Sequence, residues 1–542
     1  MAESCAARLT SGNLARCMEC TCIRHTELPH TSKLFADLMY YPDRVREFYP
    51  HVPFHPESYA AAARQVNLSA EHRAALISAL REQNGPSGSL DLLAKPGTVA
   101  VVTGQQVGLF SGPAYTIYKA LTAARLAREL TSAGIPAVPV FWLATEDHDF
   151  AEVNHAWVFD ADHQPVKLEV AGPALANQPV GEVRLASTPV DRLRDSLRTW
   201  PFGADVADRV ALAYIPGRTL GQAFAALLRD LLAPFDILQI DPMAPAVREL
   251  AAPTIRAALS RAPELKQLLL ERNRELNAAG YHAQVHLEDE TSLFFLLENG
   301  RRVALRKRNG EYLSAEGRFL PEQLMERAAR ISPNALLRPV VQDSILPTVA
   351  YIGGPAELAY LAQAEVLYRA LLGRMPVAAP RSGFTIVDAR GRKLMNRFRL
   401  CLNDFFHGED ALRERISSAL VPASLRGTLE ETRGAVGHAV DRLKTELAAF
   451  DPTLDAAVRK SYNKIAYQLS KIERKAGREM LTRDVRAVQD ARYLSNLVYP
   501  RKHLQERLYS IIPFLAKHGP GLIHELAESI NLNCPDHQLL VA

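Results

Sequence analysis

The segment ATEDHDF, residues 144–150, carries the side chains of this sequence that are best suited to moving a proton. Glu146, Asp147, His148 and Asp149 place three carboxylates beside an imidazole, directly after an apolar run. Such a group can take a proton from an attacking amine or bind a divalent cation. The carboxylates are expected to raise the pKa of His148, which suits proton exchange near neutral pH. The alternative is an aspartate that caps a helix among solvated neighbours.

A second segment, VVTGQQVGLFSGPAYTIYKA at residues 101–120, changes from a strand pattern to a helix pattern through a glycine-rich turn. Glycines let the backbone approach a ligand closely, and the exposed amides before a helix favour an anion such as phosphate or carboxylate. The turn lacks the G-K-[ST] of a P-loop and the G-x-G-x-x-G of a dinucleotide fold, so it predicts neither. A turn that needs small residues only for packing is the alternative, although Gln105 and Gln106 add amide donors and acceptors that packing does not require. The candidate contacts for substrate or nucleotide are Thr103, Gly104, Gln105, Gln106, Gly108, Ser111, Gly112 and Tyr115.

The segment YIGGPAELAY, residues 351–360, has the same design. Two glycines precede a helix start, and a glutamate in the first turn complements the helix dipole. An arginine farther on is a candidate for holding a negatively charged substrate. The additional candidate binding residues are Asn154, His155, Gly353, Gly354, Glu357 and Arg381, and no metal ligand is assigned at this site.

These segments follow predicted strands of one parallel sheet. Residues 97–106 and 135–144 are apolar runs separated by a helical pattern, which is typical of a βαβ unit whose strands are covered on both faces. Residues 235–242 predict a third core strand. Because ligands of open parallel sheets bind beyond the carboxyl ends of the strands, we expect the glycine-rich turn and the acidic segment to converge in one site.

The chain is too long for one hydrophobic core, since 542 residues exceed the usual size of a domain. We predict an α/β fold class with a Rossmann-like parallel-sheet core, connecting insertions and a C-terminal α-helical coiled coil. The expected parts are a flexible extension over 1–25, the core over 26–385 with insertions near 155–235 and 245–330, a helical arm over 386–510, and a segment over 511–542 that returns to the core. Asn-Gly pairs at 299–300 and 309–310 predict hairpin turns in the second insertion.

Apolar residues of the arm recur at steps of three, four or seven, which is coiled-coil spacing. They are Leu443, Leu447, Phe450, Leu454, Val458, Ile465, Leu469, Ile472 and Ala476. An intramolecular helical hairpin and a dimer interface both fit this pattern, because Pro452 interrupts the run. We favour a homodimer formed through the coiled coil.

Composition and charge give no reason to expect a nucleic-acid or membrane partner. The net charge of +4 comes from 64 basic and 60 acidic residues that are interleaved along the chain. No apolar run approaches the roughly 20 residues that cross a bilayer, and no signal pattern is found. The sequence therefore predicts a cytoplasmic protein.

The cysteines near the N-terminus allow two interpretations. Cys17, Cys20, Cys22 and His25 offer zinc-binding side chains within nine residues. Structural zinc sites normally pair two well-separated ligand couples, so a flexible, reduced tail is the preferred interpretation.

Taken together, TGQQVGLFSGPAYTIYKA, VPVFWLATEDHDFAEVNH and AYIGGPAELAY resemble the bacillithiol-biosynthesis cysteine-adding enzyme family, BshC. The resemblance runs from about residue 26 to the end and includes NLVYPRKHLQERLYSIIPFLAKHG after the helical arm. It implies a Rossmann-like core related to class I nucleotidyl-transferring folds, two connecting insertions, and a coiled coil that dimerises.

The resemblance also implies a ligase that joins the carboxyl group of cysteine to the amine of glucosaminyl-malate, which yields bacillithiol. Making an amide from a free carboxylate is uphill in water, so activation as an adenylate or acyl phosphate, with ATP or another nucleotide, is chemically expected. The sequence does not identify the activating group: TGQQVG stands where adenylating relatives carry a histidine-rich motif, and no KMSKS-like loop is found.

Within that reaction we assign the amine proton to His148 or Asp147, and the orientation of that group to Glu146 and Asp149. Two other functions stay open. One is a nucleotidyltransferase-like synthetase that acts on another small acid and amine, and the other is a non-catalytic dimeric coiled-coil scaffold.

Overall fold

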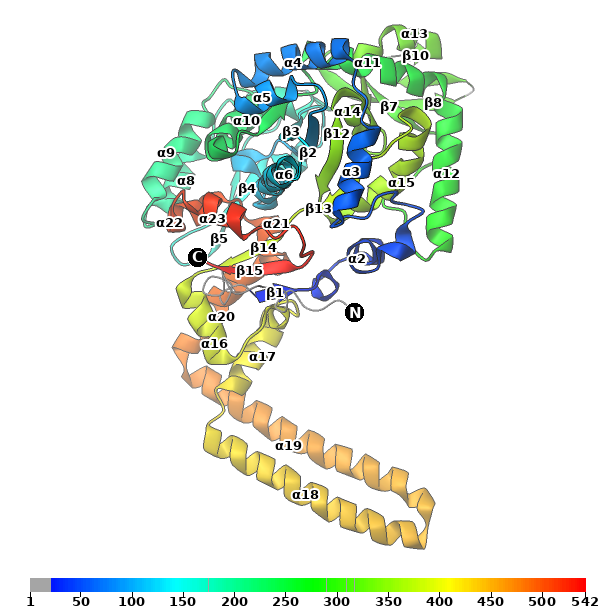
Figure 1. The fold of residues 1–542 in the computed structure, drawn as a ribbon. Helices are drawn as coiled ribbons and strands as arrows, with labels where there is room; N and C mark the ends of the chain where they lie inside the picture. The colour runs from blue at the N-terminus through cyan, green and yellow to red at the C-terminus, as the bar shows by residue number, and fades with distance from the viewer. Residues whose placement is uncertain (1–20, 174, 289, 309, 316) are drawn as a thin grey trace. The chain divides into compact units, whose positions relative to one another are not determined.

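A computed structural model describes residues 21–542 except positions 174, 289, 309 and 316 (Figure 1). The chain divides into two compact units. Unit 1 contains the described residues up to Ala161, together with Pro165–Thr385 and Glu506–Gln538. Unit 2 contains Asp162–Gln164, Ile386–Gln505 and Leu539–Ala542.

Unit 1 is built on a five-stranded parallel sheet with the order β13-β12-β2-β3-β6. Its strands are β2 (Val99–Gln106), β3 (Ala137–Ala144), β6 (Leu238–Ile240), β12 (Thr348–Gly353) and β13 (Val377–Pro380). The three core strands expected from the sequence are β2, β3 and β6, so the predicted α/β class with a parallel sheet is confirmed. The register pairs Gln106 of β2 with Ala144 of β3, which brings the carboxyl ends of both strands to one edge.

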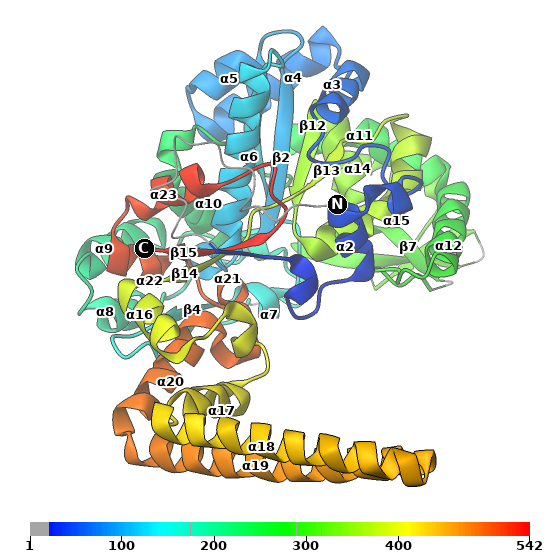
Figure 2. The same cartoon turned by 60° about the horizontal axis from the view of Figure 1, so that its bottom comes forward.

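Both faces of this sheet are buried, as the continuous apolar runs predict. Ala100 and Val102 of β2 belong to one hydrophobic cluster, while Val99 and Val101 belong to another. Helix α6 (Tyr115–Ser132) follows β2 and packs on β2 and β3. Figure 2 shows α6 beside β2. The other helices that precede or follow these strands are α2 (Lys33–Tyr40), α3 (Pro56–Gln65), α4 (Ala70–Asn84), α5 (Gly88–Leu93), α7 (Phe150–Val153) and α15 (Pro355–Leu371).

Two long connections leave the sheet and return to it. Between β3 and β6 lie β4 (His155–Phe159), β5 (Pro165–Glu169), α8 (Val190–Leu197), α9 (Gly203–Ala213) and α10 (Leu220–Leu231). Between β6 and β12 lie α11 (Pro245–Ser260), α12 (Ala262–Ala278), β7 (Thr291–Glu298), β8 (Arg301–Arg308), β9 (Glu311–Ser314), β10 (Gly317–Phe319), α13 (Pro321–Glu326), β11 (Ile331–Pro333) and α14 (Arg338–Ile345). Strands β7 to β11 form an antiparallel sheet, and Asn299 and Gly300 both have positive φ in the β7–β8 turn, as predicted for an Asn-Gly hairpin.

Three short helices lie in the late part of the chain, almost wholly within unit 1. They are α21 (Gln505–Leu508), α22 (Ile512–His518) and α23 (Leu522–Ser529). Strands β1 (Thr21–Ile23), β15 (His537–Val541) and β14 (Phe384–Val387) form a three-stranded sheet in that order.

Unit 2 is helical among its described residues and contains a long hairpin. Its helices are α16 (Ala389–Phe398), α17 (Glu409–Ala419), α18 (Ala423–Phe450), α19 (Asp455–Arg483) and α20 (Val485–Val498). Helices α18 and α19 lie side by side in Figures 1 and 2, joined by the turn at 451–454. Of the apolar positions expected from the spacing, Val458 is buried, whereas Leu443, Phe450, Ile465 and Ile472 stay exposed.

The expected N-terminal extension is described only from residue 21 onward. Thr21–Ile23 form β1, and His25 is buried at the start of a 3-10 helix. Cys17 and Cys20 of the considered zinc set lie outside the described residues. Within residues 21–542, apart from the four positions left out, no group of three or more His, Cys, Asp or Glu side chains is placed to hold a metal ion. In the same part of the chain, no helix is long and apolar enough for a bilayer.

Two glycines, one within β2 and one in the turn that follows it, are required by close packing. A Cβ atom on Gly104 would lie 2.9 Å from the carbonyl oxygen of Trp142 on β3, and one on Gly108 would lie 2.9 Å from the Cα of Gly112. The packing interpretation of this turn therefore accounts for these two glycines.

We expect Gly104→Ala to lower the free energy of unfolding by about 1–3 kcal/mol, because the new methyl group forces β2 and β3 apart. The matched control is Gly521→Ala in the same unit, where no atom lies within 4 Å of the added Cβ and φ is −59°. The control is expected to change stability by less than about 0.5 kcal/mol. Urea unfolding of both variants measures the difference, and equal effects would contradict the packing argument.

Candidate functional site

The turns that follow β2 and β3 are joined by one side chain. The Nε2 group of Gln106 donates to Oδ2 of Asp147 at 2.8 Å and to Oε2 of Glu152 at 2.8 Å. Gln106 ends β2, and both carboxylates follow β3, so the contact links neighbouring strand ends. The structure thus brings the glycine-rich turn and the acidic segment together at the carboxyl edge of the sheet.

Asp147 organises the acidic segment around its own carboxylate. Its Oδ1 accepts from the backbone N–H of His148 at 2.7 Å and of Asp149 at 3.4 Å, and lies 3.6 Å from Nη1 of Arg302. Burial acts to raise the pKa of Asp147, but the hydrogen bond from Gln106 and the charge of Arg302 outweigh it, and the pKa is lowered. Asp147 is therefore ionised at neutral pH and has donors on both oxygens.

His148 faces Arg302, which lies outside the sequence motifs. Nη1 of Arg302 lies 3.0 Å from Nδ1 of His148, and the ring of Phe295 packs on both groups. Burial and the Arg302 charge lower the pKa of His148 more than Asp147 and Asp149 raise it. The raised pKa expected from the sequence is therefore wrong, because the cation that opposes the carboxylates comes from β8.

Glu146 is buried in an ion pair away from His148. Its Oε2 lies 3.2 Å from Nη1 of Arg248 on α11, and both side chains are at most a tenth exposed. The Nε group of Arg248 donates in turn to the carbonyl oxygen of Ala329 at 2.8 Å. Glu146 ties the strand end to α11, whereas Asp149 is exposed and starts α7 without a side-chain cap.

Lys119 contacts the ends of both β2 and β12. Its Nζ donates to the carbonyl oxygen of Gly104 at 2.9 Å and to Oε1 of Gln105 at 2.8 Å, and it forms an ion pair with Glu357. Glu357 also accepts from the amide of Gly354 at 2.9 Å, which caps α15. Burial acts to raise the pKa of Glu357, but the charge of Lys119 outweighs it and the pKa is lowered. Gln105 and Glu357 are thus held by one buried ammonium group.

Tyr115 lies among three cations at the same edge. Its ring centroid is 5.2 Å from Arg381, 5.7 Å from Lys119 and 5.9 Å from Arg507, and its hydroxyl accepts from Gln105 at 3.2 Å. Arg381 is not an open anion receptor, because its guanidinium is buried against the carboxylate of Glu506, with one contact of 2.9 Å. Arg507 is exposed and can meet an anionic ligand.

The glycine-rich turn itself is closed. Ser111 and Gly112 are buried, and the amide of Ala114 donates to the carbonyl oxygen of Tyr509 at 2.7 Å. The turn therefore does not offer the exposed amides expected from the sequence, because Tyr509 and Ser510 from the late part of the chain cover it. The side chains of Gln105 and Gln106 at the end of β2 and of Tyr115 at the start of α6 are half-buried and stay accessible.

The other predicted residues are used for structure. Thr103 is buried and donates to the carbonyl oxygen of Ile352 at 2.8 Å between β2 and β12. Gly353 accepts from the amide of Arg381 at 2.9 Å. Asn154 and His155 contact each other at 2.9 Å where β4 begins.

Sequence reasoning missed the basic residues that complete this edge. They are Arg248 on α11, Arg302 on β8 and Arg507 on α21, with Glu152 and Glu506 as acidic partners. Arg302 comes from an element remote in sequence from the strand ends and belongs to none of the motifs. Arg248 lies on the helix that follows β6. Glu152 lies within VPVFWLATEDHDFAEVNH, and Glu506 and Arg507 lie within NLVYPRKHLQERLYSIIPFLAKHG, but their residue types gave no sign of this role. The alternating charges of RRVALRKR predict a solvated strand face, so nothing in that stretch marks Arg302 as buried.

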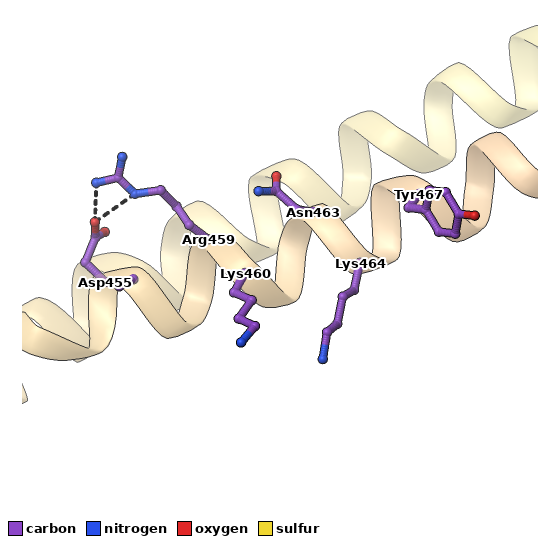
Figure 3. Close-up of a pocket in the computed structure, with 7 residues that line it drawn as sticks. Asp455, Arg459, Lys460, Asn463, Lys464 and Tyr467 are labelled. Carbon is purple, nitrogen blue, oxygen red and sulfur yellow. Dashed lines mark hydrogen bonds and ion pairs between the residues drawn. The ribbon is translucent and has the colours of Figure 1, made fainter.

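A separate open depression of about 640 Å³ lies on α19 in unit 2 (Figure 3). Asp455, Arg459, Lys460, Asn463, Lys464 and Tyr467 line it, and Arg459 pairs with Asp455. None of the residues expected to do chemistry lies there.

Comparison with known proteins defines the class first. The model "Bacillithiol biosynthesis BshC, N-terminal Rossmann-like domain" matches residues 18–382, and "Bacillithiol biosynthesis BshC, C-terminal coiled-coil domain" matches residues 384–542. These matches agree with the parallel-sheet core and the helical hairpin described above. The molecule is therefore a Rossmann-like α/β protein with a C-terminal coiled-coil domain.

Similar full-length proteins carry one name, "Putative cysteine ligase BshC". The protein of Solibacter usitatus is 59% identical and covers 97% of this chain and 100% of its own length. Those of Koribacter versatilis and Salinibacter ruber are 34% and 32% identical, covering 96% and 94% of this chain and 99% and 96% of their own lengths. This chain belongs to the BshC family of bacillithiol biosynthesis.

The stability of the fold at acid pH tests the buried pair of Arg381 and Glu506. Burial acts to raise the pKa of Glu506, but Arg381 outweighs it and lowers the pKa to about 2. A depressed pKa stabilises the fold above the ordinary glutamate pKa, and this stabilisation is lost as pH falls toward 2. The wild type is expected to lose free energy of unfolding between pH 6 and pH 3. In Glu506→Gln this loss is expected to be smaller by about 1–3 kcal/mol.

Urea unfolding across that range measures the slope. The control is Glu528→Gln, which breaks an exposed pair with Arg128 and should leave the slope nearly unchanged. Parallel slopes for the wild type and Glu506→Gln would contradict the assignment.

Proposed function

We propose that this protein is the ligase that joins the carboxyl group of L-cysteine to the amine of glucosaminyl-malate and so completes bacillithiol. The observation that carries the proposal is the full-length similarity to proteins named as cysteine ligases of this family. We place the reaction in the cytoplasm, with the two small molecules as substrates. Activation of the cysteine carboxylate by ATP or another nucleotide is part of the proposal.

The carboxyl edge of the sheet supports this chemistry. Gln106 and Asp147 join two strand ends there, and the half-buried His148 lies beside them. Amide formation needs an amine held near an activated carboxyl group, with donors for the oxygen and an acceptor for the amine proton. The edge supplies both kinds of group within one unit.

The cations around Tyr115 support an acidic substrate. Malate brings two carboxylates, and an exposed arginine can bind a carboxylate through paired N–H groups. Arg507 is the exposed cation of this group, whereas Lys119 and Arg381 are neutralised by Glu357 and Glu506. We assign the malate end of the substrate to the side of the edge where Arg507 lies.

We further propose a homodimer formed through the α18–α19 hairpin. The hairpin leaves Leu443, Phe450, Ile465 and Ile472 exposed, with half or more of Leu443, Phe450 and Ile472 accessible. Apolar side chains repeated at coiled-coil spacing are stabilised by burial against another helix.

Activity tests the function directly. Purified protein with cysteine, glucosaminyl-malate and ATP is expected to form bacillithiol, and Asp147→Ala is expected to lose about 100-fold or more of the rate because the acidic turn loses its organising carboxylate. The control is Asp162→Ala, which lies outside unit 1. A deletion strain should accumulate glucosaminyl-malate and lack bacillithiol. Unchanged thiols in that strain would contradict the proposal, and complementation by Asp147→Ala would favour the scaffold function.

Light scattering after size exclusion tests the dimer. We expect the wild type to elute as a dimer and Leu443→Glu with Ile472→Glu to shift it to a monomer, because charges cannot be buried unpaired. The control, Lys460→Glu with Lys464→Glu, changes the charge of α19 without removing an apolar group. A wild-type monomer, or an unchanged double variant, would contradict this interface.

A further inference from the structure

The hydrogen-bond partner of His148 restricts what its imidazole can do. Nη1 of Arg302 lies 3.0 Å from Nδ1 of His148. An arginine has only donors and stays protonated at all relevant pH values, so Nδ1 has to be the acceptor. A neutral imidazole with Nδ1 unprotonated carries its proton on Nε2.

Arg302 is fixed before any ligand arrives. Its Nε donates to Oγ of Ser332 at 2.9 Å and its Nη2 donates to the carbonyl oxygen of Pro333 at 2.9 Å. Its side chain is 9% exposed, and its guanidinium lies 3.9 Å from the centroid of Phe295. The arginine therefore cannot turn away to let Nδ1 take a proton.

We propose that His148 is a neutral hydrogen-bond donor, which presents Nε2–H to a substrate oxygen, and that Arg302 is the positioning residue that fixes this tautomer. The identity of that oxygen rests on the proposed function. It belongs to the activated carboxyl group or to a substrate carboxylate. His148 then does not receive the proton that the attacking amine loses.

The charges around His148 agree with a neutral ring. Asp147 and Asp149 lie on its own segment, and Oδ1 of Asp147 is 3.7 Å from Nδ1, which is too long for a hydrogen bond. Arg302 and Phe295 face the ring from β8 and β7. A proton on Nδ1 would place two donors 3.0 Å apart, and a doubly protonated ring would also place a second positive charge beside Arg302. Burial acts in the same direction, and together these effects hold the pKa of His148 below its ordinary value.

The carboxylates of the acidic segment differ in whether they are free to accept a proton. Glu146 is paired with Arg248, and Asp147 has donors on both oxygens. Asp149 is the exposed carboxylate of the segment. The amine proton thus has a nearby acceptor other than His148.

Two substitutions at one position separate a donor from a base. Glutamine keeps an N–H donor but cannot act as a base near neutral pH, so His148→Gln is expected to keep kcat within about ten-fold of the wild type. His148→Ala removes the donor and is expected to lose about 100-fold or more. The unfolding midpoints of both variants are measured, and their rates are compared only if these midpoints are equal. Equal losses in the two variants, or full activity in His148→Ala, would overturn the proposal.

Nitrogen-15 NMR of labelled histidine tests the tautomer without any substrate. The resonances that vanish in His148→Gln are expected to show an unprotonated Nδ1 and a protonated Nε2 at pH 7. Arg302→Leu is expected to raise the pKa of His148, since the opposing cation is gone while Asp147 and Asp149 remain. A protonated Nδ1 in the wild type would overturn the proposal. If the wild type forms no amide, the proposed function fails, whereas the NMR result still decides the tautomer.

Discussion

The site depends on one constraint, namely that parallel strands bring their carboxyl ends to the same edge of a sheet. Because β2 and β3 are neighbours in register, Gln106 comes within hydrogen-bond distance of Asp147 although 41 residues separate them. The amide of Gln106 then holds two carboxylates, Asp147 and Glu152, in fixed positions. Without that pairing Asp147 and Glu152 would lose the amide that joins them to the end of β2.

Buried cations determine which polar groups stay available. Arg248 neutralises Glu146, Lys119 neutralises Glu357, and Arg381 is itself neutralised by Glu506. Such pairs are costly to break because the remaining charge would be buried alone. These pairs therefore stabilise the carboxyl edge of the sheet. Only the polar side chains outside such pairs are left for chemistry.

The sequence predicts the sheet well because both faces of β2 and β3 are apolar, and this pattern is local. The same holds for the Asn299–Gly300 turn and for the helical arm. The candidate site could be predicted only where its groups follow these strands directly. Arg302 comes from an antiparallel strand about 150 residues later, so its effect on His148 depends on tertiary packing that no local pattern contains. The closed glycine-rich turn was missed for the same reason, since Tyr509 covers it from the end of the chain.

The chain order of unit 1 has a consequence for its synthesis. Residues 506–538 are translated after the long segment Ile386–Gln505 of unit 2, yet they supply Glu506 to Arg381 and the carbonyl oxygen of Tyr509 to the start of α6. Until the ribosome has produced them, Arg381 is a buried charge without its counter-ion and the turn after β2 is uncovered. The nascent sheet therefore lacks this counter-ion and this cover until residues 506–538 have been synthesised.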